Sequence, residues 1–147
     1  MLKEIDHIAL VVRDPARTAS LFKDLFAPTI ISRKDSDDHD ETFVQLGGTW
    51  FVLVKADVQR SRTGDHIAFS VSKSDLLACA EKLKQMGQEF LFARSDTALY
   101  FYDYDNHVFE LDTTDLKETW PMKSNRPLKR TAGMGCDIPV PCAAAAA

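Results

Sequence analysis

The sequence has little cysteine, no long hydrophobic run and no excess of positive charge. The three cysteines, Cys79, Cys136 and Cys142, are odd in number and form no CxxC pair, which favours reduced thiols in a cytoplasmic protein over a disulfide framework. No apolar stretch approaches the roughly 18 residues of a membrane span, and the acidic segment 1–6 is not expected to be a signal peptide. The formal net charge of −4 argues against a nucleic-acid-binding surface, because such surfaces are usually basic.

The composition is that of a globular protein, with 45% of the 147 residues hydrophobic and 27% charged. A chain of this length buries roughly two thirds of its unfolded surface, so it needs neither a disulfide nor a structural metal to fold. We expect one domain over residues 1–118. Prolines and glycines interrupt any period over residues 119–147, which are predicted to form a C-terminal tail.

An internal repeat is the most informative feature of the domain. The tetrapeptide Asp-His-Ile-Ala begins at Asp6 and recurs at Asp65. In both copies an alternating strand pattern is followed by an amphipathic helical pattern and then by three more strand patterns. The predicted fold class is therefore α+β, with two paired βαβββ modules over about 1–56 and 64–118 and a cleft between them.

Turn and cap residues punctuate this pattern. Asp14, followed by proline, is predicted to start the first helix, and Ser74 to start the second. Gly87 is expected to end the second helix, and Gly47-Gly48 predicts a tight hairpin turn in the first module.

Three side chains are candidate metal ligands. His7 and His66 hold equivalent places in the repeat, so the predicted twofold arrangement brings them toward one axis. Glu110, on the last strand of the second half, is the third candidate, and its expected counterpart in the first half is Phe51. Two histidines and one carboxylate leave positions open for water or substrate, as a catalytic metal requires. The competing interpretation is that both histidines are structural and that Glu110 lies on a solvent face.

Other polar residues are weaker candidates. His39, among the aspartates of segment 35–40, is interpreted as part of a solvated run, and His107 as an exposed turn residue. Glu41 starts the strand that leads into the hairpin. It is either a general base for a metal-bound substrate or a surface carboxylate of an edge strand, and its spacing alone favours the surface role.

The chain resembles the vicinal-oxygen-chelate superfamily, also called the glyoxalase/bleomycin-resistance superfamily. The resemblance rests on the repeated Asp-His-Ile-Ala strand, the Gly-Gly-Thr-Trp hairpin at 47–50, and the segment 100–111, Tyr-Phe-Tyr-Asp-Tyr-Asp-Asn-His-Val-Phe-Glu-Leu. Within the superfamily these residues are most similar to the fosfomycin-resistance proteins, especially their manganese-dependent epoxide hydrolase branch.

The resemblance implies a homodimer with exchanged modules and a shared metal site. It assigns His7 to one chain and His66 with Glu110 to the other. It also implies that Glu41, nine residues before Trp50, is the base that activates water. Mn(II) is the metal that the resemblance favours, and the same ligands suit Zn, Fe, Ni or Co.

The residues expected to bind substrate depart from the family pattern. Tyr100 matches a substrate-contacting tyrosine, and Trp50 is assigned to the same pocket. A hydroxyl residue is replaced by Ala9, and a phosphonate-binding arginine by Thr119. The family's glycine-rich loop is replaced by the segment 94–97, Arg-Ser-Asp-Thr. The candidates to supply the missing positive charge are Arg94 and Lys117.

The sequence thus predicts a divalent-metal enzyme that opens an epoxide, or a related small oxygenated substrate, with water. Efficient turnover of fosfomycin itself is not expected. The alternatives are another metal-dependent lyase, transferase or dioxygenase on the same fold, and a metal-free protein that sequesters a small molecule, as bleomycin-resistance proteins do.

Overall fold

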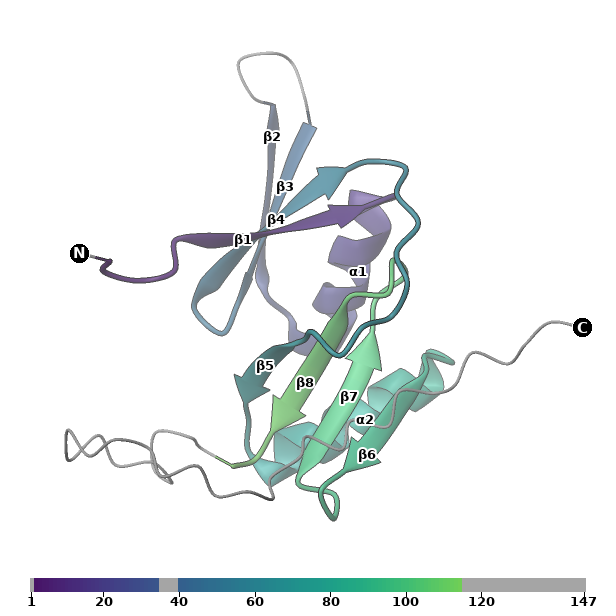
Figure 1. The fold of residues 1–147 in the computed structure, drawn as a ribbon. Coiled ribbons are helices and arrows are strands. Elements are labelled where there is room, and N and C mark those ends of the chain that lie inside the picture. The colour runs from purple at the N-terminus through teal and green to yellow at the C-terminus, as the bar shows by residue number, and fades with distance from the viewer. Residues whose placement is uncertain (1, 35–39, 115–147) are drawn as a thin grey trace, which may run out of the picture.

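The computed structural model describes residues 2–34 and 40–114, and these form two modules of the same design (Figure 1). The first comprises β1 (His7–Val12), α1 (Pro15–Phe26), β2 (Thr29–Lys34), β3 (Asp40–Leu46) and β4 (Thr49–Lys55). The second comprises β5 (Ile67–Ser70), α2 (Lys73–Gln85), β6 (Phe90–Ala93), β7 (Ala98–Tyr102) and β8 (Val108–Asp112). The predicted α+β fold with its βαβββ order is confirmed. The expected tail lies outside the described residues, as do Lys117, Thr119 and His39.

Each module contains one four-stranded sheet with the same topology. The strand orders are β1-β4-β3-β2 and β5-β8-β7-β6. In both sheets the first strand runs parallel to the last, and the other neighbours are antiparallel. The parallel pair places the start of each module beside its end, which brings the candidate histidines next to the final strands.

The strand register corrects one expectation from the repeat. Ala9 pairs with Val52 in the first sheet, and Ala68 pairs with Glu110 in the second. The counterpart of Glu110 is therefore Val52 and not Phe51, which is fully buried in the core. A shift of one residue moves a side chain to the opposite face of a strand, so counting along the sequence selected the wrong face.

The hydrophobic core is continuous between the modules. The Phe22 ring of α1 meets the Phe109 ring of β8 edge-on, with centroids 5.2 Å apart. Phe109 also stacks on Phe101 of β7 at 5.3 Å. Such aromatic pairs stabilise a core beyond their buried area, and this one joins a helix of the first module to strands of the second. The opposite face of each sheet carries polar residues, among them Glu41 in the first sheet and Glu110 in the second.

The helix caps agree with the sequence at one helix and differ at the other. Asp14 caps α1, and its side chain accepts a hydrogen bond from the Arg17 amide. The cap of α2 is Ser72, whose hydroxyl accepts from the Asp75 amide, and not Ser74 as predicted. Both residues are serines and therefore acceptable caps, so the residue type alone does not distinguish them. Neither helix of the described chain is long and apolar enough to cross a membrane.

Candidate functional site

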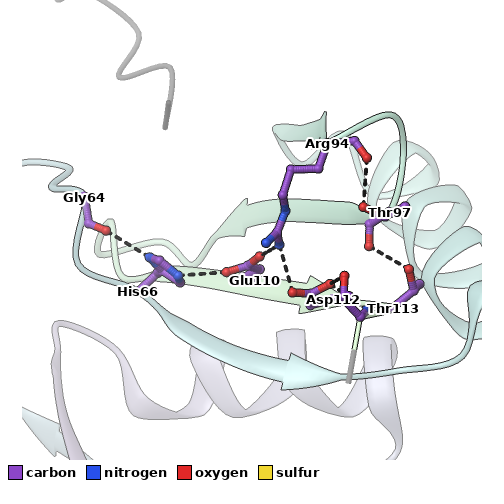
Figure 2. A network of polar contacts seen from close by, with 8 residues as sticks. Gly64, His66, Arg94, Thr97, Glu110, Asp112 and Thr113 are labelled. Atoms are coloured by element: carbon purple, nitrogen blue, oxygen red, sulfur yellow. Dashed lines mark hydrogen bonds and ion pairs between the residues drawn. The ribbon is translucent and has the colours of Figure 1, made fainter. Parts of the chain in front are cut away.

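A polar cluster lies on the face of the second sheet that points away from the core (Figure 2). His66 Nε2 is 2.7 Å from Glu110 Oε2. The Nη2 atom of Arg94 contacts Glu110 Oε1 and also Asp112 Oδ2, the latter at 2.9 Å. The edge of the Tyr100 ring meets the His66 ring, with centroids 5.5 Å apart. Four of the residues predicted for the site, His66, Arg94, Tyr100 and Glu110, are therefore adjacent in the structure.

The local fold explains this arrangement. Successive side chains of a strand alternate between faces, so Glu110 and Asp112 of β8 point to the same side. Tyr100 of β7 is the direct register partner of Glu110. His66 immediately precedes β5, the strand parallel to β8. The expectation that Glu110 lies on a solvent face is not met, because its side chain is only 5% exposed.

Charge pairing makes the burial of Glu110 tolerable, since a buried carboxylate is costly unless it is paired and hydrogen-bonded. Arg94 supplies the balancing charge. Partial burial acts to lower the pKa of Arg94, but the nearby Glu110 and Asp112 charges outweigh it and raise this pKa above its ordinary value. The guanidinium therefore stays charged beside both carboxylates.

The second ring nitrogen of each candidate histidine is already occupied. His66 Nδ1 is 2.9 Å from the Gly64 carbonyl oxygen, to which it donates. His7 Nδ1 is 2.7 Å from Asp6 Oδ2. Ligating histidines usually make this kind of bond with the nitrogen that does not face the metal, because it fixes the ring and the tautomer. Both rings thus have Nε2 available for a ligand.

The donor set around His66 fits a bound cation. With its Nδ1 proton on the Gly64 carbonyl, a neutral His66 has no proton on Nε2. Nε2 and the Glu110 carboxylate are then two acceptors only 2.7 Å apart. A proton or a metal ion must lie between such atoms, and imidazole and carboxylate together suit Mn, Fe, Co, Ni or Zn.

His7 lines a separate cavity of about 480 Å³ on the first sheet. Glu41 and Trp50, two more of the predicted site residues, line the same cavity. Trp50 is the register partner of His7. The Nε atom of Arg33 is 2.9 Å from Glu41 Oε2. The remaining lining residues are Asp6, Ile31, Arg33, Phe43 and Val52.

The two clusters occupy equivalent faces of the two sheets. Register pairs Val52 with Phe43 in the first sheet and Glu110 with Tyr100 in the second. One chain does not unite them, because its described residues include no group of three potential ligands that could hold a metal ion. Each module therefore presents half of the predicted site: His7 with Glu41, and His66 with Glu110.

His107 differs from its predicted role as an exposed turn residue. The side chain is only 8% exposed, and its Nδ1 is 2.7 Å from Asp103 Oδ2. The other Asp103 oxygen accepts hydrogen bonds from the Asp105 and His107 amides. Arg13 of the first module also pairs with Asp105 at 2.6 Å. These polar bonds fold the turn inward, and together with the Arg13 contact they fix the two modules to each other.

Three residues at these clusters were not predicted from the sequence: Asp6, Arg33 and Asp112. Asp6 could have been predicted from the sequence, because an aspartate precedes the histidine in both copies of the repeat. Asp112 lies two residues after Glu110 on a strand, which places it on the same face. No feature of the sequence indicates Arg33, since its contact with Glu41 depends on the β2–β3 register.

Known proteins share this fold. The family model of the Glyoxalase/Bleomycin resistance protein/Dioxygenase superfamily matches residues 4–111. The chain belongs to this superfamily. The match covers both modules and both half-sites, so the resemblance expected from the sequence is confirmed.

Fosfomycin resistance proteins are among the similar curated proteins. The chain is 31% identical over 126 residues to the fosfomycin resistance protein FosX of Listeria innocua, covering 80% of this chain and 95% of FosX. It is 29% identical over 130 residues to the metallothiol transferase FosB of Shouchella clausii, covering 80% and 85%. Among solved structures, a FosX variant from Listeria monocytogenes, complexed with Mn(II) and 1S,2S-dihydroxypropylphosphonic acid, matches with a TM-score of 0.72 at 31% identity. That match covers 81% of this chain and 98% of the FosX chain.

Proposed function

We propose that this protein is a divalent-metal-dependent enzyme that opens an epoxide, or a related small oxygenated substrate, with water. The observation that carries the proposal is the His66–Glu110 pair, two acceptor atoms held 2.7 Å apart with the second histidine nitrogen already bonded. The FosX structure with Mn(II) and a dihydroxypropylphosphonic acid supports the reaction class, because a vicinal diol is the product of adding water to an epoxide.

The proposed ligands are His66 and Glu110 of one chain and His7 of the partner subunit, in a homodimer. Support comes from the equivalent faces of the two half-sites and from the lack of a three-ligand group among the described residues of one chain. Mn(II) is the proposed metal, with Zn, Fe, Ni or Co as chemically suitable substitutes. When bound, such a metal acts as a Lewis acid toward a substrate oxygen.

Glu41 is the proposed general base. It lines the same cavity as His7, and this cavity is where the attacking water would bind. Glu41 would orient that water and take one of its protons as the water oxygen bonds to a substrate carbon. The carbon–oxygen bond of the epoxide would break at that carbon, and its oxygen would stay on the product and take up a proton as the second hydroxyl. The Arg33 Nε at 2.9 Å holds one carboxylate oxygen of Glu41 and restricts its rotation.

The remaining site residues are proposed to enclose the substrate. Trp50 lines the first half-site and Tyr100 borders the second. Arg94 and Lys117 are the proposed sources of positive charge toward an anionic substrate group. Ala9 leaves no hydroxyl where the family pattern has one, so the proposed substrate differs from fosfomycin. We place the enzyme in the cytoplasm on its cysteine content, without nucleic-acid or membrane partners.

Thiol transfer is the second candidate, because the metallothiol transferase FosB is also similar to this chain. Both candidates require a metal, whereas the metal-free sequestering alternative does not. Metal analysis of protein purified without added metal therefore separates the sequestering alternative from the two enzymes.

The test of the proposal is an epoxide screen with Mn(II) in water enriched in ¹⁸O. We expect a vicinal diol that carries one ¹⁸O atom, and no diol from Glu110→Ala. A product that forms only with an added thiol would assign the chain to the transferase type. Absence of bound metal and of any turnover would refute both enzymatic candidates.

A further inference from the structure

Arg94 and His66 contact different oxygens of the Glu110 carboxylate. The Arg94 Nη2 contacts Oε1, whereas His66 Nε2 lies 2.7 Å from Oε2 (Figure 2). A carboxylate can offer a cation either one oxygen or both. Here one oxygen is already engaged, so only Oε2 is turned toward the histidine.

The Arg94 side chain is itself held in place by Asp112. The Nη2 atom that touches Glu110 also lies 2.9 Å from Asp112 Oδ2. The other oxygen of Asp112 accepts hydrogen bonds from the Thr114 amide at 2.8 Å and from its hydroxyl at 2.7 Å. Asp112 therefore cannot turn away freely, and it anchors the guanidinium from the side opposite to His66.

The turn that carries Arg94 is fixed as well. Arg94, Ser95 and Asp96 all have positive φ angles, of 52°, 54° and 63°. Left-handed backbone at non-glycine residues persists only where the surroundings enforce it. Thr97 Oγ1 donates to the Arg94 carbonyl at 2.8 Å, and Lys73 Nζ bonds the Asp96 carbonyl. This strained turn directs the long Arg94 side chain across the sheet to Glu110.

We propose that Arg94, anchored by Asp112, is a positioning residue that presents the single oxygen Oε2 of Glu110, beside His66, to the divalent metal. The inference rests on the proposed function, since it concerns a ligand of the same site. In this role Arg94 positions Glu110 already in the protein without substrate. Partners of this kind, bonded to a ligand and not to the metal, typically change metal affinity by roughly 10–100-fold.

Metal affinity of the full-length protein without substrate tests the proposal. We compare Mn(II) dissociation constants of wild type, Arg94→Ala and Arg94→Lys, with Arg62→Ala as the matched control. Arg62 also pairs with a carboxylate, that of Glu89, and lies outside the cluster. Both Arg94 variants should bind Mn(II) about 10–100-fold more weakly, and Arg62→Ala should bind like wild type. Arg94→Lys keeps the charge, so it carries the test if Arg94→Ala does not fold.

The coordination number gives a second readout. The visible absorption of bound Co(II) is weaker in six-coordinate than in four- or five-coordinate sites. If Arg94 withholds Oε1, its removal lets Glu110 use both oxygens, and the Co(II) absorption of Arg94→Ala should fall. Asp112→Asn should reproduce part of the affinity loss and add nothing in the Arg94→Ala background, because Asp112 acts through Arg94.

Two outcomes overturn the inference. Tighter Mn(II) binding by Arg94→Ala would show that the guanidinium only repels the metal. Unchanged affinity and an unchanged Co(II) spectrum would show that Glu110 needs no positioning. Either result leaves the proposed enzyme intact, whereas a wild-type protein that binds no divalent metal would refute the proposed function and the inference together.

Discussion

His7 and His66 share a chemical arrangement that their places in the repeat alone do not explain. In each ring Nδ1 is bonded to an oxygen, from Asp6 in one case and from the Gly64 carbonyl in the other. The two partners differ in kind, a side chain and a backbone group, yet both leave Nε2 for a ligand. Inheritance by duplication accounts for two histidines at matching positions, but not for two different partners that have the same effect.

The Asp6–His7 bond leads to a graded prediction about metal binding. We expect His7→Ala to lose stoichiometric Mn(II), because three protein ligands leave no substitute for a missing one. Asp6→Asn should only weaken Mn(II) binding, by roughly 10–100-fold, since Asp6 orients His7 without touching the metal. Equilibrium dialysis measures both constants. Equal losses in the two variants would mean that His7 acts through the structure and not as a ligand.

Glu41 is predicted to act in turnover and not in metal binding. Glu41→Gln should keep the Mn(II) affinity of wild type and lower kcat by about 10²–10⁴-fold, the usual contribution of a general base. The change should fall on kcat more than on KM, because the lost interaction acts in the transition state. Asp40→Asn, the neighbouring carboxylate on β3, is the matched control. Full activity of Glu41→Gln on an identified substrate would remove Glu41 from the mechanism.

At the scale of the elements, the β3–β4 hairpin of the first sheet packs against β5 of the second module. Gly47 and Gly48 have φ angles of +55° and +83°. A Cβ atom on Gly47 would lie 3.2 Å from the Phe69 ring of β5. A Cβ atom on Gly48 would have no neighbouring atom within 4 Å. The first glycine is thus required by conformation and by packing, and the second by conformation alone.

Alanine substitutions separate these two requirements. Gly48→Ala should lower the free energy of unfolding by about 1–2 kcal/mol, the cost of a left-handed alanine. Gly47→Ala should cost more, because the Phe69 ring must also move. Urea denaturation measures both values. If Gly47→Ala proves the milder change, the hairpin does not pack on the second module as described.

The elements were largely predictable, and the contacts between them were not. Strand alternation and the helical stripe identify both βαβββ modules because each module follows local periodicity. The Phe51 assignment failed because register depends on which residues pair across strands. His107 was predicted to be exposed, whereas it is buried. Its burial depends on the contact with Asp103 and on the inward fold of the turn, which local spacing does not reveal. The Arg94–Asp112 contact joins a turn to a strand, and no spacing in the sequence marks it.

At the scale of the whole molecule, the two half-sites face outward on separate sheets of one chain. The predicted ligand set, His7 with His66 and Glu110, therefore requires a second copy of the chain. We expect sedimentation at micromolar concentration to give a homodimer with a large interface, as obligate dimers have. A monomer under these conditions would leave His7 without His66 and Glu110, and would contradict a shared site.

Complementation between two inactive variants tests the shared site most directly. His7→Ala and Glu110→Ala should each bind no stoichiometric Mn(II) alone, since every dimer then lacks a ligand at both sites. After unfolding and refolding together, mixed dimers hold one intact site, built from the His7 of one chain and the His66 and Glu110 of the other. Random pairing in twofold dimers predicts about one Mn(II) for every four chains. A mixture that binds no more metal than the separate variants would contradict a metal site completed by two copies of this chain.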